Sequence, residues 1–435
     1  MKGPATDGFP QSSFTLRGAG LEPKNKENLV RRDPADIDAS TALQRSDSPI
    51  APDDASLAET YQEMVRLAEA TQTTALERLE KLRNQRNELA QAAKIGDADT
   101  VELLIEAGID LNIAGDEGKT ALHFAAWNNH ASIIKIIMEQ GANVDLNVKG
   151  SDGQAALHLA AAQGHTSVVQ TLLDAKADLD IRAGTTGTEK IHAGRTPLHW
   201  AADQGRDEVA ALLIEHKADK SARSATGRSP LQDALSQGRP IIAQLLIEHG
   251  ADIHNKDEED FTALHEASAN PSDMLPIVKI LVKRGADVNA LTKWRPEPDG
   301  KKGRRTGVPA MFLAYRAGHI DTVVYLVREA RANPHLCNRC GDQVIHLASM
   351  YGQLQIVIAL LDVGVNVNVR GDDGETSLMK ARGRIDIMEC LLQRGADQSL
   401  RSSSGFDFME LCRRFEPERY EEAKRWVDEW NKRQR

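Results

Sequence analysis

Apolar and polar residues follow a pattern that repeats about every 33 residues through most of the chain. Within each repeat, apolar positions recur three and four residues apart in two short stretches, which predicts two amphipathic helices joined by a turn. The clearest unit starts at Thr196, Pro197 and Leu198. Threonine suits the helix cap, proline suits the first helical position, and the leucine then faces the interior. Gly205 ends this first helix, and a second apolar stripe follows it.

The apolar anchor of this unit recurs ten times along the chain. The anchors are Leu89, Leu122, Leu157, Leu198, Leu231, Leu264, Met311, Ile345, Leu378 and Met409. Most are spaced close to the basic period, and two longer steps reflect long loops before Thr196 and Pro309. Two short helices cannot bury their apolar faces alone, whereas stacked neighbours can. The pattern therefore predicts a stack of ten units.

Four features recur in the same order within the units: Thr-Pro-Leu-His or a variant of it, a pair of alanines, a pair of leucines, and Gly-Ala-Asp. This order resembles the ankyrin repeat family over residues 84–412. The resemblance implies an all-α solenoid of helix-turn-helix units with short β-hairpin fingers, flanked by capping helices at both ends. It also implies that fingers and first helices line a concave side, where protein partners bind.

The array is expected to occupy residues 84–415, with other segments on either side. Residues 1–56 carry six of the sixteen prolines and little that could pack, which predicts a disordered tail. Residues 57–83 are amphipathic, and this helix would either fold back as a cap over the first unit or pair with a partner as a coiled coil. We favour the cap, because polar residues at 71, 72 and 74 interrupt the apolar seam. Residues 416–435 carry an apolar stripe that predicts a C-terminal capping helix.

Composition narrows the class of function. Apolar residues make up 41% of the chain and aromatic residues only 4%, which favours helix packing through Leu, Ile, Val and Ala. A net charge of −10 argues against nucleic acid as a partner, because phosphate contacts need clustered Lys and Arg. Four cysteines fit a reducing compartment, and neither a secretory leader nor an apolar run of membrane-spanning length occurs. We therefore expect a cytoplasmic and/or nuclear monomer with no nucleic-acid and no membrane partner.

Eight of the thirteen histidines occupy repeated positions. Five follow the anchor, and three follow the slot of the glycine that ends the first helix: His123, His158, His199, His265 and His346, then His130, His165 and His319. This periodicity predicts structural imidazoles that bridge to backbone groups. We find no convincing enzyme motif and predict no catalytic residue, no cofactor and no metal site. Cys337 and Cys340 have zinc-knuckle spacing without a second cysteine pair, so a metal-regulated switch there stays as a third hypothesis.

Candidate partner-binding residues lie at the ends of first helices and at finger tips. Trp127 and Tyr351 fall at the exposed concave positions, and such aromatic side chains are typical interface anchors. The alternative for both is burial against a neighbouring unit. The finger tip formed by Asp257, Glu258 and Glu259 is acidic and would offer a charged contact, whereas Trp127 and Tyr351 would offer aromatic ones.

The long loop of residues 293–305 is basic although the chain is acidic, and it contains Trp294, Arg304 and Arg305. Three interpretations stay open. The loop could contact a partner, residues 301–305 could be a nuclear import signal, or the loop could pair with the acidic tip of residues 257–260.

The position after the repeated histidine is Phe, Leu or Trp in other units but Asp233 and Glu266 in two of them, and the unit at Thr376 is two residues shorter before its glycine. These departures predict looser packing at those units. Taken together, the sequence predicts a non-catalytic protein–protein interaction scaffold or adaptor. The alternative is an accessory or regulatory subunit that positions or inhibits an enzyme through the N-terminal helix.

Overall fold

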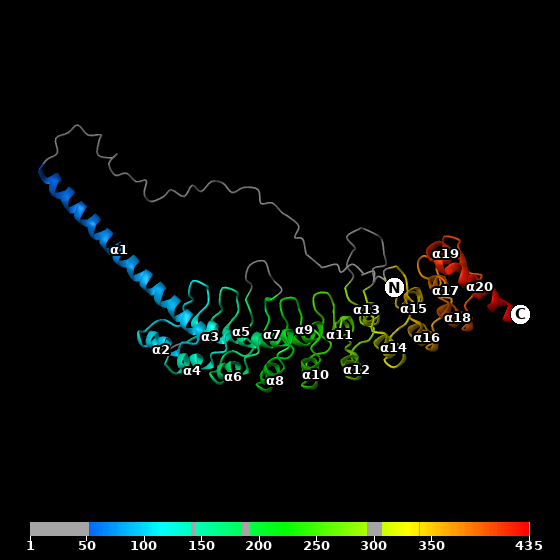
Figure 1. The fold of residues 1–435 in the computed structure, drawn as a ribbon. Helices are drawn as coiled ribbons and strands as arrows, with labels where there is room; N and C mark the ends of the chain where they lie inside the picture. Colours follow the sequence, from blue (N-terminus) through cyan, green and yellow to red (C-terminus); the bar gives the residue numbers. More distant parts are fainter. Residues whose placement is uncertain (1–51, 141–143, 185–191, 294–306, 339, 435) are drawn as a thin grey trace, which may run out of the picture. The chain divides into compact units, whose positions relative to one another are not determined.

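The chain folds into a row of helix pairs (Figure 1). The computed structural model describes residues 52–140, 144–184, 192–293, 307–338 and 340–434. By its contacts the chain divides into residues 1–75 and residues 76–435, and the helix pairs belong to the second unit. This arrangement confirms the predicted all-α stack of ten units.

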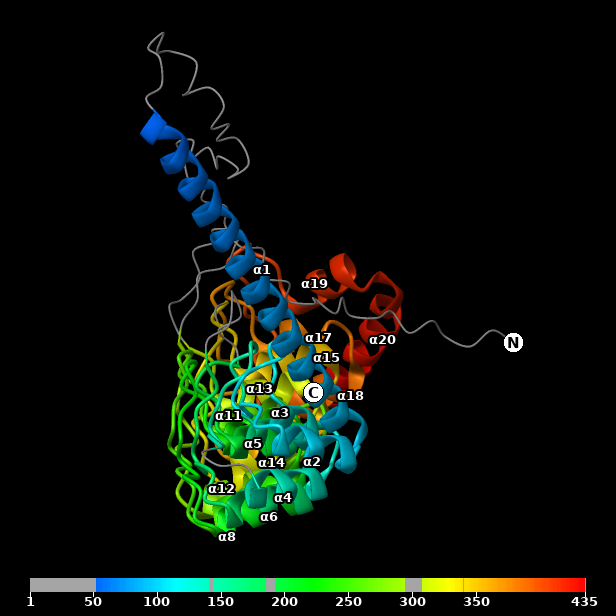
Figure 2. The ribbon, with the colours of Figure 1, turned by 90° about the vertical axis from the view of Figure 1, so that its left-hand side faces the viewer.

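Each pair has a first helix next to the fingers and a second helix on the other side. The first helices are the end of α1 (Pro52–Ile95), α3 (Ala121–Trp127), α5 (Ala156–Gln163), α7 (Pro197–Gln204), α9 (Pro230–Ser236), α11 (Ala263–Ala269), α13 (Ala310–Ala317), α15 (Val344–Tyr351), α17 (Ser377–Ala381) and α19 (Phe408–Phe415). The second helices are α2 (Ala98–Glu106), α4 (Ala131–Gln140), α6 (Thr166–Asp174), α8 (Asp207–Glu215), α10 (Pro240–Glu248), α12 (Leu275–Lys283), α14 (Ile320–Arg328), α16 (Leu354–Asp362), α18 (Ile385–Gln393) and α20 (Pro417–Arg433). The turned view in Figure 2 shows first helices α3 and α5 in a layer separate from second helices α4 and α6.

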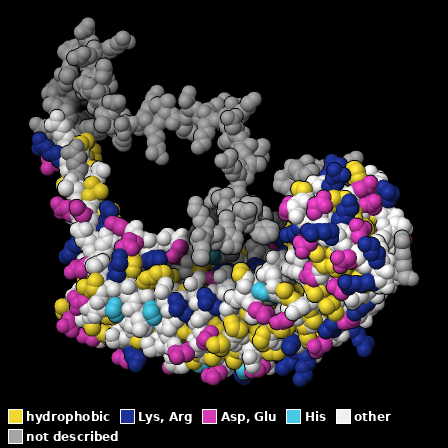
Figure 3. Space-filling view, turned by 45° about the vertical axis from the view of Figure 1, so that its right-hand side comes forward, with side chains coloured by type: hydrophobic (Ala, Val, Ile, Leu, Met, Phe, Trp, Pro, Cys, Tyr) yellow, Lys and Arg dark blue, Asp and Glu magenta, His cyan; other side chains and the backbone are white. Residues whose placement is uncertain are grey.

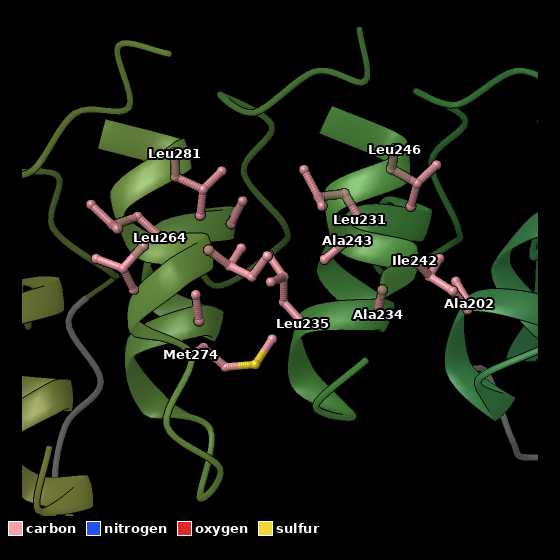
Figure 4. Close-up of a cluster of buried hydrophobic side chains, with 14 of the residues drawn as sticks. Ala202, Leu231, Ala234, Leu235, Ile242, Ala243, Leu246, Leu264, Met274 and Leu281 are labelled. Carbon is pink, nitrogen blue, oxygen red and sulfur yellow. The ribbon is translucent and has the colours of Figure 1, made fainter. Parts of the chain in front are cut away.

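The core runs between these two layers. All anchors except Met409 are buried, and Met409 is half-buried. Figure 4 shows how Leu231 of α9, Leu246 of α10 and Leu264 of α11 gather with their neighbours between the helices. First helices approach one another closely because small alanines such as Ala201 lie between them and are fully buried. The apolar area removed from water is thus shared between units, which is why the units stabilise one another.

The fingers are tight turns, in place of the expected β-hairpins. Among the described residues, extended pairing is limited to three isolated bridges: Leu291–Pro309, Cys337–Gln343 and Arg370–Thr376. In a typical finger, residues 224–228 form a turn in which the N–H of Ser224 donates to the carbonyl of Arg228 at 2.9 Å. Gly227 at φ 76° supplies the left-handed residue that this turn requires. Across the described ranges, pairing beside such turns does not extend past single bridges, so no strand forms.

Neighbouring fingers are also joined by backbone hydrogen bonds. An N–H of one finger donates to a carbonyl of the preceding finger, as from Gly184 to Gly153 at 2.7 Å and from Glu258 to Thr226 at 3.0 Å. A second set lies at the finger bases, where a side chain accepts from the next unit, as when the N–H of Asp178 donates to Asn147 Oδ1 at 2.9 Å. We call the first set the finger ladder.

Helix α1 is a single helix of 44 residues that begins before the predicted boundary at residue 57. It continues without a break into the first helix of the first unit, where Leu89 is buried. The continuous helix agrees with the absence of Gly and Pro from residues 55–95. The cap predicted for residues 57–83 stays a prediction, because residues 1–75 form a unit separate from the array. Leu79 and Leu82 on this helix are more than half exposed.

Helix α20 completes the last unit. Its residues Ala423 and Val427 are buried, and Tyr420, Trp426 and Trp430 are partly buried against the core. These are the residues of the apolar stripe that predicted a capping helix. Within the described residues, no helix combines the length and apolar character that crossing a lipid bilayer requires.

Candidate protein-binding face

The fingers and the first helices together form one face of the array, which we call the finger face. Its geometry depends on the threonine–histidine pairs at the starts of the first helices. In α7 the N–H of Thr196 donates to His199 Nδ1 at 3.1 Å, and the threonine hydroxyl lies 2.8 Å from the same nitrogen. Because Nδ1 accepts, the proton of the neutral ring lies on Nε2, which reaches the carbonyl of Arg228 at 3.0 Å. Each histidine thus fixes the following finger onto its own helix.

The same bridge recurs at all five anchor histidines, which confirms their predicted structural role. Their Nε2 atoms lie 2.9–3.0 Å from carbonyls of the next unit, those of Gln154, Arg195, Arg228, Ala290 and Val369. Burial lowers the pKa of each of these histidines, and that of His158 falls to about 4. His130, His165 and His319, which start second helices, instead reach backbone carbonyls of the preceding unit. For example, His165 Nε2 lies 2.9 Å from the carbonyl of Trp127.

One unit makes this bridge with glutamine. The N–H of Ser229 donates to Gln232 Oε1 at 3.0 Å, and Gln232 Nε2 donates to the carbonyl of Phe261 at 2.7 Å. An amide carries an acceptor and a donor on opposite atoms, as does a neutral imidazole with its proton on Nε2. Gln232 therefore takes the place of the histidine at this position.

We expect His199→Gln to preserve most of the stability and His199→Ala to lower the free energy of unfolding by about 1–3 kcal/mol. The alanine variant leaves the N–H of Thr196 and the carbonyl of Arg228 without partners, whereas glutamine can bond both, as Gln232 does. Urea unfolding followed by circular dichroism measures both losses. Equal losses for the two variants would contradict this role of the imidazole.

The two aromatic residues predicted as partner contacts on first helices, Trp127 and Tyr351, are exposed at the ends of those helices. The exposed fraction is 45% for Trp127 and 54% for Tyr351. The backbone carbonyl of Trp127 is held by His165, and Lys119 Nζ lies 5.5 Å from the centre of its ring. Neither side chain is buried against a neighbouring unit, so the alternative interpretation is wrong for both. Large exposed aromatic surfaces on fixed backbone are suited to contact with a protein.

The acidic tip lies at the finger between α9 and α11. The side chain of Glu258 is exposed, while those of Asp257 and Glu259 are half-buried. Lys293, the first residue of the long basic loop, donates from its backbone N–H to the carbonyl of Glu259 at 2.7 Å and from Nζ to the carbonyl of Glu258. The start of the loop therefore adjoins the acidic tip through backbone carbonyls. Trp294, Arg304 and Arg305 lie outside the described residues, as do residues 1–51.

Behind the acidic tip, a buried cluster of charged residues replaces the apolar side chains found in other units. Arg228 donates from Nε to Asp233 Oδ1 at 2.9 Å and from Nη1 to Glu266 Oε1 at 2.5 Å. It also lies 3.5 Å from Asp257 Oδ2. Asp233 is fully buried and Glu266 almost so, and burial raises the pKa of Glu266. The two carboxylates predicted to loosen the packing are thus held by one guanidinium, which the pattern within a single unit did not reveal.

Sequence reasoning missed a third charged residue in the same slot, Lys380. Its ammonium is buried and lies near Asp342 at 3.4 Å, near Glu375 at 3.5 Å and in contact with Asp373. The three carboxylates raise the pKa of Lys380 in spite of its burial. The sequence does hold a signal for this site, because acidic residues stand in the finger before Lys380's own helix (Asp373 and Glu375) and in the finger of the preceding unit (Asp342). Figure 3 shows basic and acidic side chains interspersed over the C-terminal units of the array.

The cysteine pair of the third hypothesis sits on a finger. Cys337 is half-buried and Cys340 exposed, and both are thiols. Within the described residues, no three His, Cys, Asp or Glu side chains come together in a way that could hold a metal ion. The structure therefore brings no further ligand to this pair among the residues it describes.

Ten stacked helix pairs with a finger face define a helical-repeat solenoid. The profile of the family described as ankyrin repeats (3 copies) matches residues 66–148, 89–183, 142–224, 183–257, 221–292 and 310–402. The chain belongs to the ankyrin repeat family. Proteins of this family are generally protein–protein interaction modules and are typically non-catalytic.

Several curated proteins share part of the array. Ankyrin repeat and SAM domain-containing protein 6 of Rattus norvegicus is 32% identical over 127 residues, which cover 28% of this chain and 14% of the relative. A fowlpox virus (strain NVSL) ankyrin repeat protein is 32% identical over 138 residues, 31% of this chain and 38% of the relative. A Danio rerio protein whose name designates a palmitoyltransferase is 29% identical over 133 residues, 31% of this chain and 18% of the relative. In each case the similarity spans well under half of the relative's length.

Proposed function

We propose that this protein is a non-catalytic scaffold or adaptor that binds protein partners on its finger face. The observation that supports this most directly is the pair of exposed aromatic residues on fixed first-helix ends, Trp127 and Tyr351. Aromatic side chains supply large contact area at low conformational cost and are enriched among residues that dominate binding energy. We also propose a cytoplasmic and/or nuclear location and a monomeric state.

Binding through the finger face should depend on these aromatic residues. We expect Trp127→Ala or Tyr351→Ala to weaken at least one partner tenfold or more, because each removes the centre of a contact area. The chain is used as bait in a lysate, retained proteins are identified by mass spectrometry, and affinities are then measured with the purified partner. If every retained partner binds both variants as tightly as the parent chain, these residues are not the site.

A matched control is available on the second helices. Leu103 of α2 and Ile241 of α10 are 66% and 64% exposed, so Leu103→Ala/Ile241→Ala removes a comparable apolar surface from the other layer. This double variant should bind with less than a twofold change. A loss equal to that of the aromatic variants would indicate a general effect on the fold.

The second candidate function is an accessory subunit that positions or inhibits an enzyme through the N-terminal helix. The exposed apolar side chains of α1, including Leu76, Leu79 and Leu82, favour this candidate. Deleting residues 1–83 separates the two proposals. Loss of the partner on deletion supports docking through α1, and retention supports the finger face.

A further inference from the structure

The finger face changes at its C-terminal end, where α17 is shorter than its neighbours. Helix α17 has five residues, whereas α15 and α19 on either side have eight each (Figure 1). Because this unit lacks two residues, Arg382 stands directly before the glycine that ends the helix. Tyr351 stands directly before the corresponding glycine of α15, and Phe415 is the last residue of α19. An arginine thus stands between two aromatic residues in the series of helix ends.

Phe415 is an exposed ring in contact with two guanidinium groups. Its exposed fraction is 49%. Arg382 Cζ lies 4.4 Å from the centre of this ring, and Arg414 Cζ lies 5.8 Å from it. Arg414 Cζ also lies 5.2 Å from the ring centre of Phe406. Such contacts with aromatic rings position a guanidinium without consuming its N–H donors.

The chain itself leaves these arginines largely unpaired. Within the part of the chain that the structure describes, no carboxylate oxygen lies within 4.0 Å of Arg384 or Arg414. Arg382 Nη2 lies 4.0 Å from Glu375 Oε2, an oxygen that Lys380 Nζ approaches more closely, at 3.5 Å. Arg382 Nε is buried and makes no hydrogen bond. The guanidinium groups therefore keep donors for an acceptor from outside the chain.

Arg384 joins this group from the start of α18. Its side chain reaches back toward the preceding unit, so that a methyl group at Gly352, next to Tyr351, would lie 3.3 Å from Arg384 Cδ and Nε. Burial and then the positive charge of Arg419 lower the pKa of Arg384, and the neighbouring carboxylates do not offset them. A bound anion would offset both. We call Tyr351, Arg382, Arg384, Arg414 and Phe415 the arginine–aromatic patch.

We propose that the arginine–aromatic patch binds an acidic segment of a protein partner, with an Asp or Glu carboxylate on the guanidinium groups and an apolar residue beside it on Phe415. The proposal rests on the function proposed above and adds the chemistry of the partner at the end of the finger face that holds Tyr351. Charge complementarity selects this occupant, because a guanidinium binds a carboxylate through two parallel N–H bonds. A basic segment would meet like charge here, which disfavours it strongly.

Comparative selection from a random dodecapeptide display library tests the proposal on the full chain. Arg382→Gln/Arg414→Gln removes two charges from the patch, and the informative peptides are those that the parent chain retains and this variant does not. They should carry a required Asp or Glu. A synthesised peptide should bind the parent at least tenfold more weakly when that residue becomes Asn or Gln. Its affinity should also fall as salt is raised, because the contact is between charges.

Two further variants control for effects on the fold. Arg328→Gln/Arg394→Gln removes two exposed arginines at the ends of α14 and α18, and it should change the affinity less than twofold. Arg414→Gln alone changes one exposed side chain and should weaken the peptide at least threefold, which keeps the test decisive if the double patch variant is less stable. Circular dichroism and thermal melting of all variants verify that the fold is retained.

Three results would overturn the proposal: no retained peptide depends on the patch, the dependent peptides need no acidic residue, or a mixed-sequence single-stranded DNA dodecamer binds the patch as tightly as the peptide. Peptides that bind only after residues 1–51 are deleted would assign the patch to the chain's own N-terminal segment and would also overturn it. A partner that is lost with Trp127→Ala or Tyr351→Ala but unaffected by the double patch variant would leave the proposed function standing and remove this inference alone.

Discussion

Arg228→Met is expected to destabilise the middle of the array by about 3–5 kcal/mol, one of the two largest effects we predict. The variant leaves Asp233 and Glu266 buried without their shared counter-charge, and a methionine offers them no hydrogen bond. Because long repeat arrays need not unfold in one step, urea unfolding should be combined with hydrogen exchange at α9 and α11. The exchange of these two helices should accelerate more than that of α3 or α15.

Two comparisons make this result specific. Arg328→Met breaks an exposed pair with Asp362 and should cost less than about 1 kcal/mol. The triple variant Arg228→Met/Asp233→Leu/Glu266→Leu converts the cluster to the apolar composition of other units and should regain most of the lost stability. If the single variant is as stable as the parent, the guanidinium does not hold these carboxylates in the way described here.

Mild acid should destabilise the array steeply between pH 6.5 and pH 4. Burial lowers the pKa of all five anchor histidines, so in this range the unfolded chain takes up protons that the folded chain does not. Stability is therefore fully present above pH 6.5 and is lost as pH falls toward the folded pKa. For His158, whose pKa falls to about 4, the loss amounts to about 3 kcal/mol. Glu266 and Asp342, whose pKa values are raised by burial, act in the opposite direction.

Urea midpoints at pH 7.5, 6.5, 5.5 and 4.5 measure this dependence. His158→Gln provides the control, because glutamine keeps both hydrogen bonds but takes up no proton. Its stability should fall less with acid than that of the parent chain, by about 1.4 kcal/mol for each pH unit in this range. Parallel pH profiles for the two proteins would contradict the assignment of neutral, buried imidazole.

Much of this fold could be predicted from the sequence because the repeat multiplies weak local signals. Thr196, Pro197 and Gly205 each mark a helix boundary with modest energy, but ten units with the same order leave few alternatives. The same register placed Trp127 and Tyr351 at the ends of first helices, and the structure decided between exposure and burial there. What the register could not supply was any interaction between units that departs from the common pattern.

Arg228 illustrates this limit. Its partners Asp233 and Glu266 lie 5 and 38 residues away, and the second belongs to the next unit. Within a single unit each of these charged residues only interrupts the apolar pattern. Their opposite charges are seen to pair only when neighbouring units are stacked. The length of α1 follows from a simpler signal. Helix formers without Gly or Pro extend through the polar residues at 71, 72 and 74, which interrupt the apolar seam but not the helix.

The finger ladder has a mechanical consequence for whatever binds across it. Each rung of the ladder is one hydrogen bond, in which the backbone N–H of one finger tip donates to a carbonyl of the preceding tip, as from Ala225 to Ala193 at 2.8 Å. A tip pulled sideways must lengthen rungs to both neighbours, so the tips resist displacement as a strip and not as separate loops. A ligand touching several tips therefore meets a surface whose spacing is set in advance, and it loses little affinity to ordering that surface.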